Sequence, residues 1–359
     1  MKDSWTKKLD LSMLDPGNQG CTLKRDRDRW IFETSRSRKD IETALEGKDW
    51  SKLSFTEFCS TCSYFHELAH VQAVETAYSI EIPPPIKLGR VFFAEASRVL
   101  SHLRYVAVTC QNAGSPSYLP IFRARRMFLD QIHSFTGEPR LPRNKIGGLL
   151  FDFGAANGIS KIRELIDVLS EKIVFWLSSL PEQRSMARLD SIEIITAEEC
   201  HDHLTTGPLA KACGIPSDVR LKDPNGMYSL FVNFKPVIFD SSVATAYDSI
   251  AIRFEEVIDS LRLMNGALKA LDSMTWQNTA ITRPETEQLE GEMMYRIETP
   301  SGELLHYFLA DNKPGPSYYR YLPPFLLNRP SMVHCLDKRP ITNAAVIIHC
   351  FDLCMACGG

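Results

Sequence analysis

Apolar residues recur three or four positions apart along much of the chain, which is the spacing of one face of an amphipathic helix. Glycine and proline interrupt this pattern at the points where such helices would end. The pattern predicts helices over residues 41–47, 65–77, 86–108, 120–136, 162–180 and 241–271. We therefore expect a mainly α protein, a helical bundle with small β appendages.

Shorter apolar segments predict those β appendages. A hairpin is expected over residues 293–310, with its turn at Thr299–Gly302, and single short strands at Arg29–Glu33 and within 140–152. Prolines after 310 suggest irregular connections. The remaining segments are predicted as a loose polar entry, a loop-rich region and a short buried run: 1–28, 184–240 and 344–351. We expect two parts, a polar N-terminal segment 1–36 and a single domain 37–359.

Composition narrows the class of protein. The 359 residues are 44% hydrophobic and 24% charged, which is typical of a globular chain. The net charge of −3 gives no electrostatic case for binding nucleic acid. No apolar run reaches the ~20 residues that span a bilayer, and no signal core follows Met1. We expect a cytoplasmic chain whose ten cysteines are free thiols or metal ligands rather than disulfides.

Two cysteine pairs with the spacing Cys-x-x-Cys are the strongest candidate for chemistry. Cys59 and Cys62 lie in the first fifth of the chain, and Cys354 and Cys357 lie near the other end. Four thiolates suit zinc, a two-iron cluster, or nickel with iron, and they disfavour magnesium and calcium. From spacing alone, a four-thiolate metal site and unrelated buried cysteines both remain open.

The segments around these pairs resemble the large subunits of [NiFe] hydrogenases, in the branch shared with the quinone-site subunit of respiratory complex I. The first pair stands in Cys59-Ser-Thr-Cys62-Ser-Tyr-Phe-His66, similar to the family's Cys-Gly-x-Cys-Ser-x-x-His. The second stands in Asp352-Leu-Cys354-Met-Ala-Cys357, similar to Asp-Pro-Cys-x-x-Cys. Matching residues continue in order between the pairs: Arg90, Glu95, Arg98, His102, Gly147, Gly207, Asp218, Arg220, Arg253, Glu256, Glu303 and His306.

The resemblance implies a fold, ligands and partners. It implies the helical bundle of that family, with Cys59 and Cys354 terminal on nickel and Cys62 and Cys357 bridging to an iron that carries CO and CN. Electrons would pass through iron–sulfur clusters of a small partner subunit, because this chain has no further cysteine motif for them. Complex I-like membrane subunits, a quinone, and a peripheral location on the cytoplasmic face of the membrane are implied as well.

The chain departs from the family at several positions. Glu57 and Ser60 replace the family's arginine and glycine at the first pair, and Asp40 replaces a glycine before Glu42. Ser301 replaces the arginine of a Pro-Arg-Gly turn that places a guanidinium over the metals. Because serine lacks the cation and its forked donors, Ser301 is predicted to alter the surroundings of the cofactor.

Other residues carry two interpretations. Glu42 is a proton relay or a surface carboxylate in a first helical turn. His66 is a hydrogen-bond donor beside the thiols or a packing histidine. The helix residues Arg90, Glu95, Arg98 and His102 favour an ion-paired face. We expect His201 and His203 to be exposed. We expect Cys335 and Cys350 to pack in the interior as small hydrophobic residues.

Three functions are compatible with these patterns. The first is the catalytic subunit of a membrane-associated [NiFe] hydrogenase, an oxidoreductase that interconverts hydrogen with protons and electrons, with Glu42 and His66 as catalytic residues. The second is a complex I-like electron-transfer or quinone-module subunit that has lost hydrogen activation. The third is a structural scaffold held together by zinc.

Overall fold

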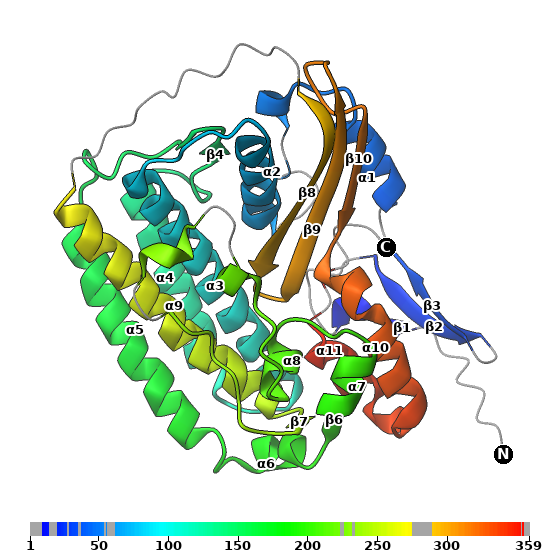
Figure 1. Ribbon diagram of the computed structural model, residues 1–359. Helices are drawn as coiled ribbons and strands as arrows, with labels where there is room; N and C mark the ends of the chain where they lie inside the picture. Colours follow the sequence, from blue (N-terminus) through cyan, green and yellow to red (C-terminus); the bar gives the residue numbers. More distant parts are fainter. Residues whose placement is uncertain are drawn as a thin grey trace.

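Four long helices form one side of the protein. In the computed structural model the described residues are 9–13, 20–26, 29–34, 37–53, 55, 62–222, 226–231, 234–274, 289–352 and 354. The central pair, α3 and α9, packs along its whole length, and two outer helices cover it (Figure 1). These helices are α3 Pro84–Asn112, α4 Tyr118–Thr136, α5 Ile159–Ser179 and α9 Asp248–Asp272. The expected mainly α architecture with small β parts is confirmed.

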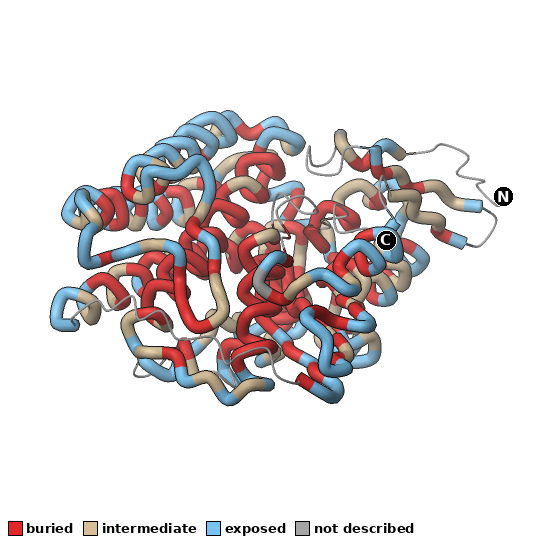
Figure 2. The backbone as a smooth tube through the Cα atoms, turned by 90° about the horizontal axis from the view of Figure 1, so that it is seen from above, coloured by how far each residue is buried: buried red, intermediate tan, exposed pale blue. Residues whose placement is uncertain are grey.

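The ends of these helices follow from local sequence. Pro84 occupies the first turn of α3, where its missing N–H would have no partner in any case. Gly137 ends α4 with a left-handed φ of 72°, and its N–H bonds the carbonyl of His133 at 2.9 Å. Buried segments run through the interior while the outer turns are exposed (Figure 2).

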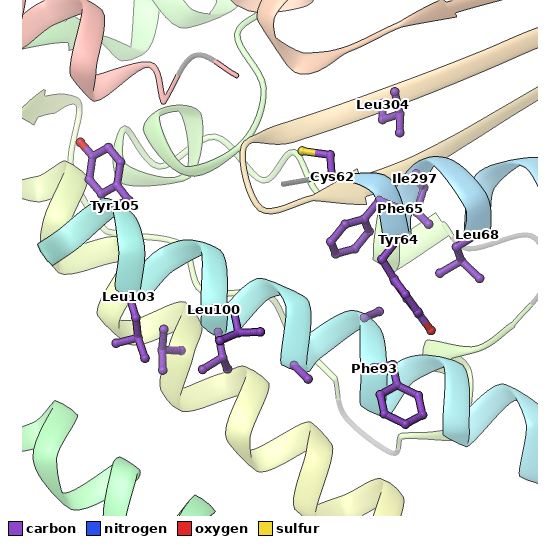
Figure 3. Close-up of a cluster of buried hydrophobic side chains, with 14 of the residues drawn as sticks. Cys62, Tyr64, Phe65, Leu68, Phe93, Leu100, Leu103, Tyr105, Ile297 and Leu304 are labelled. Carbon is purple, nitrogen blue, oxygen red and sulfur yellow. The ribbon is translucent and has the colours of Figure 1, made fainter. Parts of the chain in front are cut away.

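A fifth helix, α2 Ser63–Ala77, is buried on every side. The sequence predicted one buried face, but His66, His70 and Glu75, which lie outside that face, are buried as well. α2 lies between α3 and the sheet, and its aromatic side chains point toward α3 (Figure 3). The single-face prediction is therefore wrong, because α2 has protein around its whole circumference.

The predicted hairpin is confirmed and belongs to a three-stranded antiparallel sheet. Strands β8 Glu290–Thr299 and β9 Gly302–Asp311 pair so that Thr299 faces Gly302 across the turn. The third strand, β10 Tyr318–Leu322, pairs with β9 in a segment predicted as irregular. Helix α1 Arg38–Leu45 packs on β10, close to the range expected for it.

The N-terminal part is more ordered than predicted. Three short antiparallel strands form a sheet whose Leu23 and Trp30 enter the core. The third, β3 Arg29–Glu33, is confirmed as predicted. The prediction of a loose entry over 1–28 is wrong for β1 Leu9–Asp10 and β2 Thr22–Asp26. Side chains on both faces are partly buried, which weakens the alternating pattern.

Short elements fill the remaining segments. The loop-rich region contains α6 Arg184–Asp190, β6 Glu193–Thr196, α7 Ala197–Asp202, α8 Pro208–Ala212 and β7 Val243–Thr245. The late part contains α10 Pro324–Lys338 and α11 Ala344–Cys350, where irregular connections and a buried run had been expected. Two-stranded pairs and 3-10 turns complete the chain: β4 Asn144–Lys145 with β5 Gly148–Leu149, and Leu11–Met13, Trp50–Lys52, Val219–Lys222, Tyr228–Leu230 and Ile341–Asn343.

Candidate functional site

The fold brings one cysteine of each pair to the same end of α2. Cys62 is buried directly before that helix, and its carbonyl accepts a hydrogen bond from the N–H of His66 at 3.0 Å. Burial lowers the pKa of His66 to about 4, and an electrostatic effect of Cys354 acts in the opposite direction. Cys59 and Cys357 fall outside the described residues, so their predicted roles stay predictions.

A line of hydrogen bonds runs from His66 into the sheet. Nδ1 of His66 lies 3.0 Å from Nε2 of His306, and Nδ1 of His306 lies 2.7 Å from the hydroxyl of Tyr319. Burial lowers the pKa of both imidazoles, so both are neutral near pH 7. The ring of Phe55 stacks on His66. The predicted histidine is thus joined to a second histidine and a tyrosine, which the sequence did not connect.

Glu42 is buried rather than exposed, which corrects the interpretation as a surface carboxylate. Its carboxylate accepts a hydrogen bond from the N–H of Tyr321 at 3.2 Å and lies 3.4 Å from Arg320. Burial raises the pKa of Glu42. The ring of Tyr321 meets that of His66 edge-on, with centroids 5.3 Å apart. One residue therefore separates Glu42 from the histidine line.

Ser301 lies in the β8–β9 turn and is directed at the segment that precedes the second cysteine pair. Its hydroxyl donates to the carboxylate of Asp352 at 2.9 Å. The guanidinium of Arg253 lies 3.7 Å from the same carboxylate and 3.7 Å above the ring of Tyr105. Asp352 has a φ of 48°, a left-handed conformation that is rare outside glycine. The turn and the segment before Cys354 are thereby held together.

A glycine allows a second loop to approach this turn. Gly207 has a φ of 79°, and a Cβ at this position would lie 2.6 Å from the carbonyl oxygen of Ser301. It would also lie 2.7 Å from the Cα of Gly302. The hydroxyl of the preceding Thr206 accepts a hydrogen bond from the N–H of Glu303 at 3.3 Å. Only glycine fits here, because backbone atoms occupy the space that a side chain would need.

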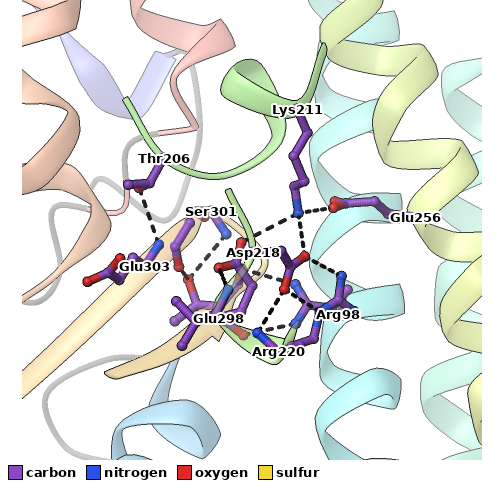
Figure 4. Close-up of polar contacts among 12 residues, drawn as sticks. Arg98, Thr206, Lys211, Asp218, Arg220, Glu256, Glu298, Ser301 and Glu303 are labelled. Carbon is purple, nitrogen blue, oxygen red and sulfur yellow. Dashed lines mark hydrogen bonds and ion pairs between the residues drawn. The ribbon is translucent and has the colours of Figure 1, made fainter. Parts of the chain in front are cut away.

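A buried charge cluster lies beneath the turn (Figure 4). Its first centre is Glu95, which accepts hydrogen bonds from Tyr228 at 2.5 Å, Ser260 at 2.6 Å, Arg98 at 3.2 Å and Arg220 at 3.3 Å. Although burial alone would raise the pKa of Glu95, the two guanidinium groups lower it. Arg98 also donates to the carbonyls at the end of β8, Glu298 at 2.9 Å and Thr299 at 3.0 Å.

The second centre of the cluster is Lys211, a fully buried lysine. Its ammonium group contacts three carboxylates, those of Asp218 at 3.2 Å, Glu298 at 3.4 Å and, most closely, Glu256. These carboxylates raise the pKa of Lys211 against the opposing effect of burial. On its other side Glu256 meets His102, with Nε2 at 2.8 Å.

The cluster changes the interpretation of the helix residues. Arg90, Glu95 and Arg98 are ion-paired as predicted and His102 contacts Glu256, but all four are buried. Apart from the pair between Arg98 and Glu95 on α3, their partners come from other elements. Arg90 pairs with Glu75 through two short bonds, 2.6 and 2.7 Å. Lys211 and Glu298 were not singled out from the sequence. The available signal was that each stands in a segment of mostly apolar residues.

The other predicted residues are simpler. His201 is exposed, as expected, and Cys335 and Cys350 are buried among core side chains, also as expected. His203 is partly buried, with its ring 4.4 Å from that of His334. Among described residues no three His, Cys, Asp or Glu side chains are grouped as a metal site requires. Two of the four predicted thiol ligands lie outside that part of the chain.

One protein family, described as "Respiratory-chain NADH dehydrogenase, 49 Kd subunit", matches residues 114–358, which is more than half of the chain. The chain belongs to this family. The 49 Kd subunit family consists of oxidoreductase subunits, so the predicted relationship to complex I is confirmed. Membership of the [NiFe] hydrogenase large subunits themselves stays a prediction.

Three curated relatives show how far the similarity extends. The NADH-quinone oxidoreductase D subunit of Desulfitobacterium hafniense is 29% identical over 257 residues, which cover 70% of this chain and 67% of the relative. The first C/D subunit of the same oxidoreductase in Aquifex aeolicus is 26% identical over 301 residues, 79% of this chain and 50% of the relative. The carbon monoxide-induced hydrogenase of Rhodospirillum rubrum is 24% identical over 305 residues, which cover 83% of this chain and 82% of the relative.

The fold of this chain also matches a solved structure. A chain of the membrane-bound sulfane sulfur reductase, an archaeal respiratory membrane complex, superimposes with a TM-score of 0.82 at 18% identity. The match covers 99% of this chain and 98% of that chain. In the described part of this chain, no helix is long and apolar enough to cross a membrane.

Proposed function

We propose that this chain is an electron-transfer or quinone-module subunit of a complex I-like respiratory oxidoreductase, and that it does not activate hydrogen. It would lie peripherally on the cytoplasmic face of the membrane, between a small iron–sulfur subunit and membrane subunits. This is the second of the three functions that the sequence left open. The relatives named as NADH-quinone oxidoreductase subunits support it, and the relative named a hydrogenase supports the first function less broadly.

The observation that carries the proposal is the state of the β8–β9 turn. Hydrogen activation in the resembling family relies on a guanidinium at this turn, and here the turn presents the hydroxyl of Ser301. That hydroxyl donates to Asp352, and the nearby guanidinium of Arg253 lies over the ring of Tyr105. Both polar groups therefore serve to hold the chain in place, and neither offers a forked cation to a cofactor.

The thiols fit a bound metal. Cys62 and Cys354 both lie beside His66, and thiol donors suit a soft or borderline metal ion. We propose that Cys59, Cys62, Cys354 and Cys357 would hold such a metal; nickel with iron is what the hydrogenase resemblance implies, and zinc what the spacing implies. When bound, the group would supply an electron-accepting or structural centre at this end of α2.

The histidine line gives the site a route for protons. A proton that reaches Nε2 of His66 would displace one from Nδ1 to His306, and His306 would release one from its Nδ1 to Tyr319. Tyr319 would in turn give up its own hydroxyl proton to the quinone, so that each group ends with the number of protons it began with. Each step exchanges the tautomer of a neutral ring, so no charge has to stay on a buried imidazole. Reduction of a quinone consumes protons as well as electrons, and this line can deliver them.

The first test uses the complex purified from native membranes through a tag on this chain. With dithionite-reduced viologen as the donor, we expect reduction of a soluble quinone analogue. We expect no dye reduction by hydrogen gas. Hydrogen-dependent dye reduction, together with nickel and infrared bands of iron-bound CO and CN, would contradict the proposal and restore the hydrogenase function. Zinc in the purified complex, with no electron transfer at all, would instead support the third function, a structural scaffold held together by zinc.

A second prediction concerns the histidine line. His306→Gln keeps a buried polar side chain but removes the imidazole, whose two ring nitrogens can accept a proton on one side and release one on the other. The rate of quinone reduction should therefore fall about ten- to a hundredfold, with a steeper dependence on pH. The matched control is His70→Gln. His70 is equally buried on the same helix as His66 but donates its hydrogen bond to the carbonyl of Trp50 at 3.0 Å. Equal losses in both variants would show that only packing was disturbed.

A further inference from the structure

The buried charge cluster holds one more carboxyl group than it has cations. Its carboxyl groups are those of Glu95, Asp218, Glu256 and Glu298, and its permanent cations are Arg98, Lys211 and Arg220. His102 adds no charge near pH 7, because burial lowers its pKa. An uncompensated buried charge is costly, so one of the four carboxyl groups is expected to carry a proton.

The hydrogen bonds indicate which group carries it. Asp218 accepts from the N–H and two guanidinium nitrogens of Arg220 and from Lys211. Glu256 has the closest contact with Lys211. Glu298 has the weakest set, with the N–H of Val219 at 3.1 Å and Lys211 at 3.4 Å. In agreement with this, burial and the neighbouring charge of Asp218 raise the pKa of Glu298 to about 7.

Glu298 also lies next to space that water can enter. A surface pocket of about 410 Å³ opens between β8 and residues 215–222. A second space of about 10 Å³, room for about one water, is lined by Glu298, Arg220 and Tyr228. The two spaces share the lining residues Val219, Tyr295 and Arg296, so they adjoin. These adjoining spaces are where water would have to bring a proton to this carboxyl group.

The position of Glu298 connects it to the candidate site. It lies three residues before Ser301, and Arg98 binds its carbonyl and that of Thr299. Ser301 in turn holds Asp352, two residues before Cys354. The charged groups that surround Glu298 are Lys211 from α8, Asp218 and Arg220 from the segment before and within the 3-10 turn Val219–Lys222, Glu256 from α9, Arg98 from α3 and Arg296 from β8.

We propose that Glu298 is a proton-loading residue: it carries a proton at rest, gives it up to the reduced acceptor when an electron passes, and takes the next one from water in this pocket. The uptake step is balanced: hydronium and the carboxylate become water and the carboxylic acid. The electron comes from the iron–sulfur partner and goes to the acceptor. The inference rests on the proposed function, because it assigns the proton that accompanies the electron.

The experiment compares Glu298→Gln with the matched control Glu292→Gln in the complex purified from membranes. Glu292 stands on the same strand with an exposed side chain. In infrared spectra we expect the wild type to show the C=O stretch of a protonated carboxylic acid, shifted in D₂O and lost as the pH rises through about 7. The band should be absent from Glu298→Gln and present in Glu292→Gln. A band that persists in Glu298→Gln, or none in the wild type, would overturn the inference.

Two further measurements separate this inference from the proposed function. Glu298→Asp retains the carboxyl group and should keep a band with a shifted pH midpoint, so a folding defect in the glutamine variant cannot imitate the result. Quinone reduction should lose its midpoint near pH 7 in Glu298→Gln alone. Quinone reduction without the band overturns proton loading and leaves the proposed function standing. A band without any electron transfer refutes the proposed function and with it the coupling.

Discussion

Lys211→Met should destabilise the full-length chain by about 3–5 kcal/mol, because it removes the cation of a buried ion-pair group and leaves its partners uncompensated. The ammonium group of Lys211 is surrounded by Asp218, Glu256 and Glu298 in the interior. Methionine matches the length of the lysine stem but supplies no charge. The measurement is urea unfolding near pH 7, with the midpoint and the slope determined separately.

The matched control is Lys222→Met. Lys222 is an exposed lysine in the segment that packs beside β8, and its replacement should change stability by no more than about 0.5 kcal/mol. Adding Glu256→Gln to Lys211→Met should recover part of the loss, since one uncompensated carboxylate disappears. Equal stabilities of the two single lysine variants would show that the cluster is solvated and that its charge count does not matter.

Gly207→Ala should cost roughly 2–5 kcal/mol and disturb the β8–β9 turn. Two effects add at this position. A residue other than glycine is strained at a φ of 79°, and the new methyl group would meet the backbone of Ser301 at 2.6 Å. Backbone atoms cannot move aside as a flexible side chain can, so the turn itself must shift. Because Ser301 would then lose Asp352, electron transfer should fall together with stability.

Gly137→Ala separates the two effects. Gly137 has a similar φ of 72°, but nothing lies within 4 Å of a Cβ built on it. Its replacement should therefore cost only about 1 kcal/mol, from backbone strain alone. The difference between the two alanine variants measures the close approach of the Gly207 loop to the turn. A difference near zero would mean that this approach is loose.

Local sequence signals predicted the elements whose ends they mark. Gly137 ends α4, and the turn Thr299–Gly302 joins β8 to β9, as expected. β10 was missed because its five residues follow a proline-rich segment and depend on β9 for pairing. The burial of α2 could not be predicted either, since some of its polar side chains have partners that lie far away in sequence, such as His306 for His66.

The site was predictable as a set of residues and not as an arrangement. His66 and Ser301 were singled out, yet their partners His306 and Asp352 come from segments more than 50 residues away in each case. Glu42 was left open between a proton relay and a surface carboxylate, because its place in a first helical turn does not reveal that strand β10 covers it. The charged residues of the cluster come from five separate segments, and no spacing rule links Lys211 to Glu298.

The meeting of Cys62 and Cys354 beside His66 has a consequence for biogenesis. The two residues are separated by almost the whole length of the chain, so the ribosome must finish nearly all of it before the thiols can meet. Helix α2 is enclosed on every side, so it likewise cannot be buried until β8 and β9 have been synthesised. Slow translation of the last segment, or a reagent that blocks the thiols of the nascent chain, should therefore leave a precursor whose helices have formed. In that precursor the end of α2 that carries Cys62 would still lack the segment with Cys354.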